Sequence, residues 1–500
     1  MAKGSLSVFF AMILVSIMCV LFTMGECVRL YEIQNFAKQD TDMAVESAFS
    51  EYNPYLWANY KILAIDLGYG SKSAGPGMME QKAYDYCKFN TDLDDGYNFF
   101  GLSVDSCSTR DYSLLTDEKG AGVISLGIKA SKQEMASQII DGIQGHIDSV
   151  NNIEKIPVEE KARAAKESLN NAKEALEEEK RKAREGKADD TVATDYPEPG
   201  EVEDNPLDAF DLLKESFSRG VLATVINTDK LSDSSVENMG ALPSHRKLLE
   251  GTMDIENGHS LVDKGLFIDY VMTNYSYFGS DINHDGLNYE VEYLLSGKGT
   301  DPQCLASVVE QILIVRECAN YKTILNNPSM VAQAGAIAET LAGFTMNPAI
   351  VEAVKYGVIG AWAYAEAVLD VRLLLSGGKV APIKTLDQWT SDIWHLSKVT
   401  NVNFKAKDCG SGTGYKEYLM AFLALRTNEK LAMRALDIME NALNSTEDYK
   451  EAKVDNMLWA ADMELTYSAE EKFLSLFAGG NAKRGEIGKY YFVTNKSISY

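Results

Sequence analysis

The stretch LSVFFAMILVSIMCVLFTM (residues 6–24) decides the architecture of this chain of 500 residues. It carries no charged side chain. As a helix it would rise about 28 Å, which is about the thickness of the hydrocarbon core of a bilayer. A cleavable secretory signal would have a shorter apolar region ending in an A-x-A-like site, whereas this one runs into Gly25-Glu26-Cys27. The stretch therefore predicts a retained transmembrane helix over residues 6–25, with membrane contact through residues 6–24.

The charges that flank this segment indicate its orientation. Lys3 and the α-amino group precede it, and Glu26 follows it. The positive-inside rule then makes residues 1–5 a short cytoplasmic leader and places the bulk of the chain on the extracytoplasmic side. We therefore expect a single-pass protein of the cell membrane, held there by a signal anchor.

An amphipathic juxtamembrane helix is predicted over residues 26–53. One helical stripe carries mostly small or apolar side chains, namely Leu30, Ile33, Ala37, Ala44, Ala48 and Tyr52. Asn53-Pro54 closes the helix, because the residue before a proline is pushed out of the α region. One long helix that is first apolar and then amphipathic is the plan of a pilin-like subunit. A plain anchor followed by a juxtamembrane helix fits the pattern equally well.

Composition and cysteine usage exclude some classes of protein. With 73 acidic and 48 basic residues the formal charge is −25, which repels phosphate backbones and argues against nucleic acid as a partner. The seven cysteines include no CxxC pair, so a zinc ribbon or a thioredoxin-like site has no support. Cys87 and Cys107 either pair outside the cell or stay buried as free thiols.

The rest of the chain divides into three predicted segments. Residues 54–149 form a mixed α/β segment, in which short apolar runs such as KILAID (61–66) and GVISLGI (122–128) are separated by glycine-rich turns. Residues 150–205 form a charged insertion. Its i,i+4 pairs, such as Glu178–Lys182, and its interrupted heptad predict an exposed, coiled-coil-like helix followed by an acidic linker. Residues 206–500 form a mainly helical C-terminal domain.

Within this last segment we expect helices near 303–324, 348–376, 427–444 and 450–478, followed by a strand-like end, KYYFVTNKSISY. Residues 348–376 are apolar enough to suggest a second span. Glu352, Lys355, Glu366 and Asp370 favour a buried core helix instead, because charges inside a membrane are costly. The predicted fold class is α+β: a predominantly helical ectodomain on a single N-terminal transmembrane helix, with a charged helical insertion.

The sharpest local motif is DINHDGLNYEVE (residues 281–292), which satisfies the pattern of a calcium-binding loop. Asp281, Asn283, Asp285 and Glu292 would supply side-chain oxygens and Leu287 a carbonyl, while Gly286 allows the sharp turn. Position eight is Asn288 rather than an apolar residue, and no second loop is available for pairing. An Asp/Asn/Gly surface turn is the structural alternative. Calcium is the only cofactor that the sequence suggests.

Catalytic motifs are weak in comparison. The five histidines are far apart and match no HExxH spacing, and no G-x-S-x-G elbow is present. We therefore predict no catalytic residues and a non-enzymatic protein. A hydrolase whose residues assemble from distant positions is the third hypothesis.

The N-terminus MAKGSLSVFFAMILVSI, followed by MGECVRL, resembles the N-termini of pseudopilins of tight-adherence (Tad) pilus systems. These have a short basic leader ending in glycine and an apolar helix that closes in a Glu-x-x-Arg-like exit. The resemblance implies that a prepilin peptidase cuts after Gly4 and leaves Ser5 as the new N-terminus. Phe9 departs from the pattern, because it stands where typical pilins carry a glutamate.

Further segments resemble an uncharacterised, Tad-associated family of anchored proteins in Gram-positive, clostridia-type bacteria. They include NPLDAFDLLKESFSRGVLATVI (205–226) and YEVEYLLSGKGTDPQCLASVVEQILIVRECANY (289–321). The resemblance implies a pseudopilin-like or accessory component of a Tad-type surface structure, with pilus or secretion components as partners. It also implies a folding role for Glu292, within YEVEY. The alternative function is a calcium-stabilised surface binding or adhesion module.

Overall fold

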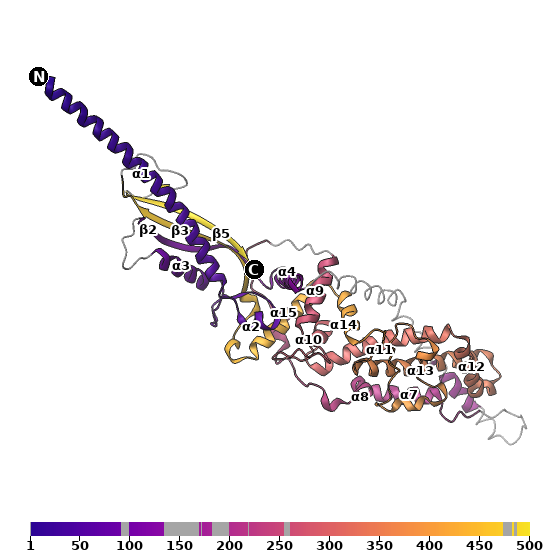
Figure 1. Ribbon diagram of the computed structural model, residues 1–500. Helices are drawn as coiled ribbons and strands as arrows, with labels where there is room; N and C mark the ends of the chain where they lie inside the picture. Colours follow the sequence, from indigo (N-terminus) through magenta and orange to yellow (C-terminus); the bar gives the residue numbers. More distant parts are fainter. Residues whose placement is uncertain are drawn as a thin grey trace, which may run out of the picture. The chain divides into compact units, whose positions relative to one another are not determined.

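The computed structural model describes residues 2–91, 100–134, 170–171, 173–182, 200–218, 220–254, 261–473, 483–484 and 488–500 (Figure 1). The fold is α+β, as the sequence predicts: it is mostly helical, with a small antiparallel sheet and one long apolar helix at the N-terminus. The chain divides into two compact units. Unit 1 comprises residues 1–130, 240–258 and 435–500, and unit 2 comprises residues 131–239 and 259–434.

Unit 1 combines the N-terminal helix with the sheet. Its elements are α1 (Ala2–Phe49), α2 (Pro54–Tyr60), β1 (Ile65–Asp66), α3 (Gly77–Thr91), β2 (Leu102–Leu114), β3 (Met457–Glu470), β4 (Lys483–Arg484) and β5 (Lys489–Ser499). Two further helices cross the boundary between the units, α4 (Asp117–Glu134) and α15 (Asn428–Asn444).

The sheet is built around β3. Strand β2 pairs antiparallel with one edge of β3, from Leu102 opposite Ala469 to Leu114 opposite Leu458. Strand β5 pairs antiparallel with the other edge, and β1 continues that edge, since Leu458 also pairs with Ile65. Strand β4 pairs with β5. The two long partners of β3 are therefore far apart in the sequence.

The predicted helix over 450–478 is wrong, because Met457–Glu470 is this central strand. Its alanine, methionine and glutamate residues favour a helix by propensity, but its apolar residues alternate. Met463, Leu465, Tyr467 and Ala469 are 0–1% exposed, and the residues between them are more exposed or polar. That period of two is the pattern of a strand whose one face packs on helices, and here tertiary pairing overrides local propensity.

The second half of α1 packs on this sheet together with α3. The predicted stripe is confirmed for Leu30, Ile33, Ala37, Ala44 and Ala48, which are 0–1% exposed. They join a core cluster with residues of α3 and of the strands, among them Met79, Ala83, Leu465, Tyr467 and Phe492. Tyr52 lies beyond the end of α1 and is only partly buried.

The first half of α1 extends past the strands β2, β3 and β5 (Figure 1). Its large apolar side chains from Leu6 to Met24 are exposed by between 39% and 67%. In the part of the chain that the structure describes, α1 is the one helix long and apolar enough to cross a membrane. It is therefore compatible with a single-pass anchor.

Unit 2 is helical. Its main helices are α7 (Pro206–Ser218), α8 (Val221–Val225), α9 (Leu261–Asn274), α10 (Glu290–Ser296), α11 (Asp301–Leu325), α12 (Pro328–Ala342), α13 (Pro348–Leu375) and α14 (Tyr415–Ala424). Short 3-10 helices are η1 (Thr228–Lys230), η2 (Met239–Ala241), η3 (Pro243–His245), η4 (Gly343–Thr345), η5 (Leu386–Gln388), η6 (Ile393–Thr400), η7 (Glu447–Tyr449) and η8 (Val454–Asn456), some of which belong to unit 1.

Asn-Pro pairs begin several of these helices as well as ending the preceding segment. Asn327 accepts hydrogen bonds from the backbone N–H groups of Ser329 and Met330, and Asn347 accepts one from Ala349. In both cases the proline is the first helical residue, where its missing N–H is not needed. The same arrangement follows α1, where Asn53 caps α2.

Most of the other predicted elements are confirmed. Helices α11, α13 and α15 correspond to the predicted 303–324, 348–376 and 427–444, and β5 to the strand-like end. Helix α13 is a core helix, since its residues from Gly357 to Leu374 are almost all buried. Of the two apolar runs in the mixed segment, KILAID ends in β1 and GVISLGI lies in α4.

The charged insertion is described only in part. Residues 170–171 and 173–182 are helical, and the Nζ of Lys182 lies 3.3 Å from a carboxylate oxygen of Glu178, as the i,i+4 spacing predicts. Residues 150–169 and 183–199 lie outside the described residues. The coiled-coil character of the insertion and most of its acidic linker therefore stay predictions.

Candidate functional site

The strongest candidate is the point at which α1 leaves the sheet, where Glu26 and Arg29 form a buried ion pair. The two residues are one turn apart on α1 and are 1% and 3% exposed. The Nε and Nη2 atoms of Arg29 donate to the two carboxylate oxygens of Glu26 at 3.0 and 2.6 Å. This two-point arrangement uses the planar fork of the guanidinium, which matches a carboxylate.

Both members of the pair also bind the backbone of the sheet. Arg29 donates from Nη1 to the carbonyl oxygen of Phe100 at 2.6 Å and from Nη2 to that of Glu470 at 2.5 Å. The carboxylate of Glu26 accepts hydrogen bonds from the N–H groups of Lys472 at 3.4 Å and Phe473 at 3.1 Å. The pair therefore joins α1 to the residues just before β2 and just after β3.

Burying two charges is costly, and the cost is offset only when each remaining hydrogen-bonding position is filled. Here four backbone groups at the ends of β2 and β3 supply such hydrogen bonds. A shift of α1 by one residue along the sheet would leave a buried charge without its partners. The Glu26–Arg29 pair therefore fixes the register of α1 on the sheet.

Aromatic contacts flank the pair. Phe36 stacks on Phe100 with ring centres 6.0 Å apart, and Phe22 stacks on Phe473 at 6.1 Å. The first contact lies on the sheet side of the pair and the second on the side of the exposed segment. Such stacked rings add directional packing to the ion pair.

A second group of polar side chains fixes α1 farther along the sheet. The hydroxyl of Tyr467 donates to Asp40 at 3.0 Å and lies 3.1 Å from the hydroxyl of Thr41. Asn90, on α3, donates to Asp40 at 2.8 Å. Asp40, Thr41 and Tyr467 are at most 1% exposed. The packed half of α1 is thus held by specific hydrogen bonds as well as by apolar contact.

Cys87 and Cys107, in α3 and β2, are free thiols in the structure. The Sγ atom of Cys87 lies 3.3 Å from the hydroxyl oxygen of Tyr467. Burial raises the pKa of each of these two thiols to about 12. They are therefore uncharged at neutral pH and poor nucleophiles.

The residues of the predicted calcium loop differ in their exposure to solvent. Asp281, Asn283 and Asp285 are exposed, whereas Leu287 and Glu292 are buried. Gly286 has φ of +98°, so the sharp turn that the motif needs is present. Among the described residues, no three His, Cys, Asp or Glu side chains are grouped as a metal site. Calcium binding by this loop stays a prediction.

Glu292 has structural contacts of its own. One oxygen of its carboxylate accepts hydrogen bonds from the N–H of Phe278 at 2.9 Å and from the hydroxyl of Tyr415 at 2.7 Å. The other oxygen has no hydrogen-bond partner within the described ranges. Burial raises the pKa of Glu292 to about 7, although both hydrogen bonds oppose that shift.

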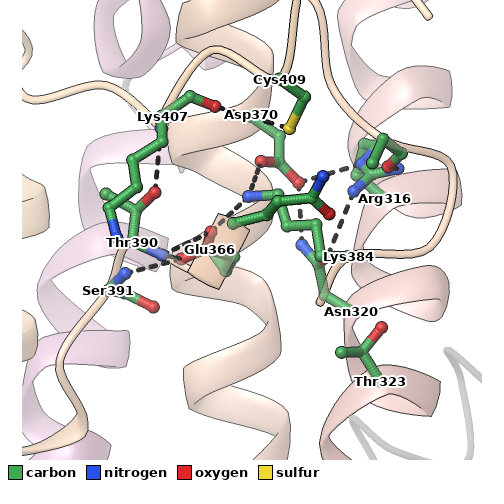
Figure 2. A network of polar contacts seen from close by, with 12 residues as sticks. Arg316, Asn320, Thr323, Glu366, Asp370, Lys384, Thr390, Ser391, Lys407 and Cys409 are labelled. Carbon is green, nitrogen blue, oxygen red and sulfur yellow. Dashed lines mark hydrogen bonds and ion pairs between the residues drawn. The ribbon is translucent and has the colours of Figure 1, made fainter. Parts of the chain in front are cut away.

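Unit 2 contains a buried ionic network that joins α11, α13 and the segment after α13 (Figure 2). Arg316 donates from Nε to Asp370 at 2.9 Å, and Asn320 donates to the same oxygen at 3.0 Å. Lys384 contacts the carboxylates of both Glu366 and Asp370. The side chains of these four charged residues are 0% exposed.

Backbone groups complete this network. Glu366 accepts hydrogen bonds from the N–H groups of Thr390 and Ser391, and Arg316 donates to the carbonyl oxygens of Ala381 and Pro382. Two cations and two anions balance one another, and the chain from 381 to 391 is tied to both helices. No ligand is needed to explain these contacts, so the network is best understood as structural.

Sequence reasoning found these sites only in part. The charges in α13 identified a core helix, but Lys384 lies in an irregular segment and no pattern linked it to Asp370. The sequence places Glu26 and Arg29 directly after the apolar segment, and no pattern in it predicts that they are buried. The signal available for α13 was a glutamate and an aspartate four residues apart in an otherwise apolar helix.

Two of the described histidines, His284 and His395, contact nearby carboxylates. Nδ1 of His284 lies 2.9 Å from Glu290, and Nδ1 of His395 lies 2.7 Å from Asp392. Each is thus a local His–carboxylate contact. His146 and His259 lie outside the described residues.

These features define an α+β protein with one candidate membrane helix and buried polar contacts that serve the fold. The chain belongs to the family of unknown function DUF5702, which matches residues 197–469, more than half of its length. Comparison with curated proteins and comparison with solved structures each gave no match. The family match covers β3 and most of unit 2, including the ionic network.

The Glu26–Arg29 pair predicts a large effect on the stability of unit 1. In the substitution Arg29→Leu a buried carboxylate loses its partner, so we expect the free energy of unfolding to fall by about 3–5 kcal/mol. Lys38→Leu removes an exposed cation from the same helix and should change it by less than about 0.5 kcal/mol. The free energies of unfolding of both variants are measured by urea titration of the detergent-solubilised protein, with hydrogen exchange of β3 as the readout. Equal stabilities of the two variants would show that the pair does not hold the helix.

The network of Figure 2 predicts a similar contrast in unit 2. Lys384→Met leaves two buried carboxylates without their cation and should destabilise unit 2 by about 3–5 kcal/mol. Lys355→Met, on α13, breaks only a surface pair with Glu352 and should cost about 1 kcal/mol or less. Thermal unfolding of the two variants, measured side by side, separates the outcomes. A loss for Lys384→Met no larger than for Lys355→Met contradicts the structural role.

Glu292 predicts a pH dependence with a definite sign. Its pKa is raised to about 7 from 4.5, so the folded state binds an extra proton between these values. The stabilisation that comes from this proton is at most about 3 kcal/mol in the free energy of unfolding. It is fully present below about pH 4.5 and is lost as the pH rises through 7. Glu292→Gln should remove this slope, whereas Glu352→Gln, on an exposed residue, should keep it. Denaturant titrations from pH 4.5 to 7.5 test this, and an unchanged slope in Glu292→Gln would refute it.

Proposed function

We propose that this protein is a non-enzymatic component of a Tad-type pilus or related surface structure, anchored in the cell membrane with its bulk on the extracytoplasmic side. Its role there is pseudopilin-like or accessory. The observation that carries the proposal is the two-part helix α1. Its first half is apolar and exposed, and its second half is built into the core of an antiparallel sheet.

The division of α1 supports this role. No side chain from Leu6 to Met24 is buried, whereas Glu26, Arg29, Leu30 and Ile33 on the following turns are 0–3% exposed. Residues 6–24 thus remain available for lipid or for apolar helices of other subunits, while the head is held at a fixed point on the same helix. A flexible tether would bring the head to the membrane without this fixed geometry.

The resemblance of the N-terminus supports the Tad-type assignment specifically. Gly4 and Ser5 lie in the first turns of α1, directly before the apolar segment, where the cleavage site of a prepilin falls. Glu26 and Arg29 match the Glu-x-x-Arg exit of the pseudopilins. The structural role of this pair gives a physical reason for such an exit, because it ends the exposed segment and begins the packed one.

A calcium-stabilised surface binding module is the second candidate. The turn at Gly286 and the exposure of Asp281, Asn283 and Asp285 support it. Glu292 opposes it, because its carboxylate already binds Phe278 and Tyr415. A rise in melting temperature with calcium that is abolished by Asp281→Asn would favour this candidate. An extracytoplasmic hydrolase, the third hypothesis, has no supporting geometry among the described residues.

The proposal predicts a processed N-terminus. We expect the membrane-extracted protein to begin at Ser5, and the same protein from cells lacking a prepilin peptidase to begin at Met1. N-terminal sequencing of the two preparations measures this. Gly4→Leu should block cleavage, whereas Ala2→Leu, in the leader but away from the cut, should not. A chain that begins at Met1 in both cell types would contradict prepilin processing.

A further inference from the structure

Unit 2 contains a cavity of about 400 Å³ between α7, α11 and α13. Its walls are mostly apolar and include the rings of Phe210 and Phe217 from α7 and of Tyr364 from α13. Its volume lies in the range of pockets that hold small organic molecules. None of the lining residues that the structure describes takes part in the network of Figure 2 or in the contacts of α1 given above.

The sequence builds this cavity by spacing. Phe210, Lys214 and Phe217 are four and three residues apart, so they lie on one face of α7. Glu310, Leu313, Ile314 and Glu317 likewise share one face of α11. Each helix thus presents both apolar and charged side chains to the same space.

Three aromatic rings pack against one another on one side of the cavity. Tyr364 meets Phe210 and Phe217 edge to face, with ring centres 5.2 and 6.3 Å apart. Phe210 already has a cation near its ring, because the Nζ of Lys173 lies 5.4 Å from the ring centre. Ring faces carry negative charge density and attract ammonium groups within about 6 Å.

The charged groups add a net negative charge. Glu317 is 8% exposed, and Glu310 and Lys214 are exposed. Among the described lining residues, two carboxylates and one ammonium leave a formal charge of −1, and the nearby Lys173 is paired with Asp211 at 2.5 Å. Burial and the charge of Glu317 raise the pKa of Tyr364, so its ring stays a neutral phenol.

We infer that this cavity binds a small organic cation, of the class of alkylammonium compounds. The rings of Phe217 and Tyr364 would contact the cationic head, the aliphatic wall would contact its alkyl groups, and the net negative charge of the described lining would favour the cation. A bare divalent metal ion needs about six oxygen ligands, which this mostly apolar wall does not offer. An anion would face the same carboxylates with only Lys214 in its favour.

Choline and its uncharged isostere, in which carbon replaces the quaternary nitrogen, test the inference directly. Titration of the full-length protein in detergent, followed by calorimetry or ligand-observed NMR, should show one saturable choline site per chain. The isostere should bind at least about tenfold more weakly, because it lacks the charge. Equal binding of the two compounds, or no binding of choline, would overturn the inference.

Variants assign the binding to this cavity. Phe217→Leu should weaken choline binding about fivefold or more, and Glu310→Gln, at an exposed position, should weaken it less. Lys214→Gln should strengthen binding, because it removes the repelling charge. Tyr356→Leu is the matched control, since Tyr356 is an exposed ring on α13 beside Lys355 and outside the cavity. If Glu310→Gln and Lys214→Gln had the same effect on choline binding, a cation site in this cavity would be contradicted. The inference does not depend on the Tad-type role, so either can fail alone.

Discussion

The ion pair between Glu26 and Arg29 sets the boundary between the two halves of α1. Both side chains are removed from solvent, and both are completed by backbone groups at the ends of β2 and β3. A charge in such a place is tolerated only with all its partners. The pair therefore fixes which residues of α1 pack on the sheet and which remain exposed.

The rest of unit 1 is consistent with this fixed register. Small side chains such as Ala37, Ala44 and Ala48 allow α1 to lie close to the strands, and Tyr467 joins Asp40 and Thr41 from the sheet side. Unit 2 also contains buried ion pairs that fix the position of one segment of the chain. Arg316, Asp370, Lys384 and Glu366 tie an irregular segment to two helices with no net charge. In both units buried charges select one arrangement of the chain.

Local patterns in the sequence predicted the helices well. The apolar stretch before Gly25, the stripe from Leu30 to Ala48, and α11, α13 and α15 all follow from periodicity and from Asn-Pro boundaries. The central strand was predicted as a helix, since Met457–Glu470 has helix-forming residues and its alternation has meaning only beside β2 and β5. The buried networks were largely missed for the same reason: Lys384 is near Glu366 and Asp370 only after the fold has formed. Whether the calcium motif forms a binding loop depends on the direction of the Glu292 side chain, and the spacing of residues alone does not predict that direction.

The central proposal is that α1 is one helix whose exposed apolar half faces lipid and whose second half packs on the sheet, with the boundary at Glu26. A scan of single spin labels along residues 6–48, in the protein reconstituted in liposomes, tests this most directly through accessibility to oxygen. The account predicts high oxygen accessibility all around the helix up to Met24. Beyond Glu26 it predicts low accessibility that repeats every three to four residues, with minima at Leu30, Ile33 and Ala37. Uniform water exposure before residue 25, or no periodicity after it, would contradict the account.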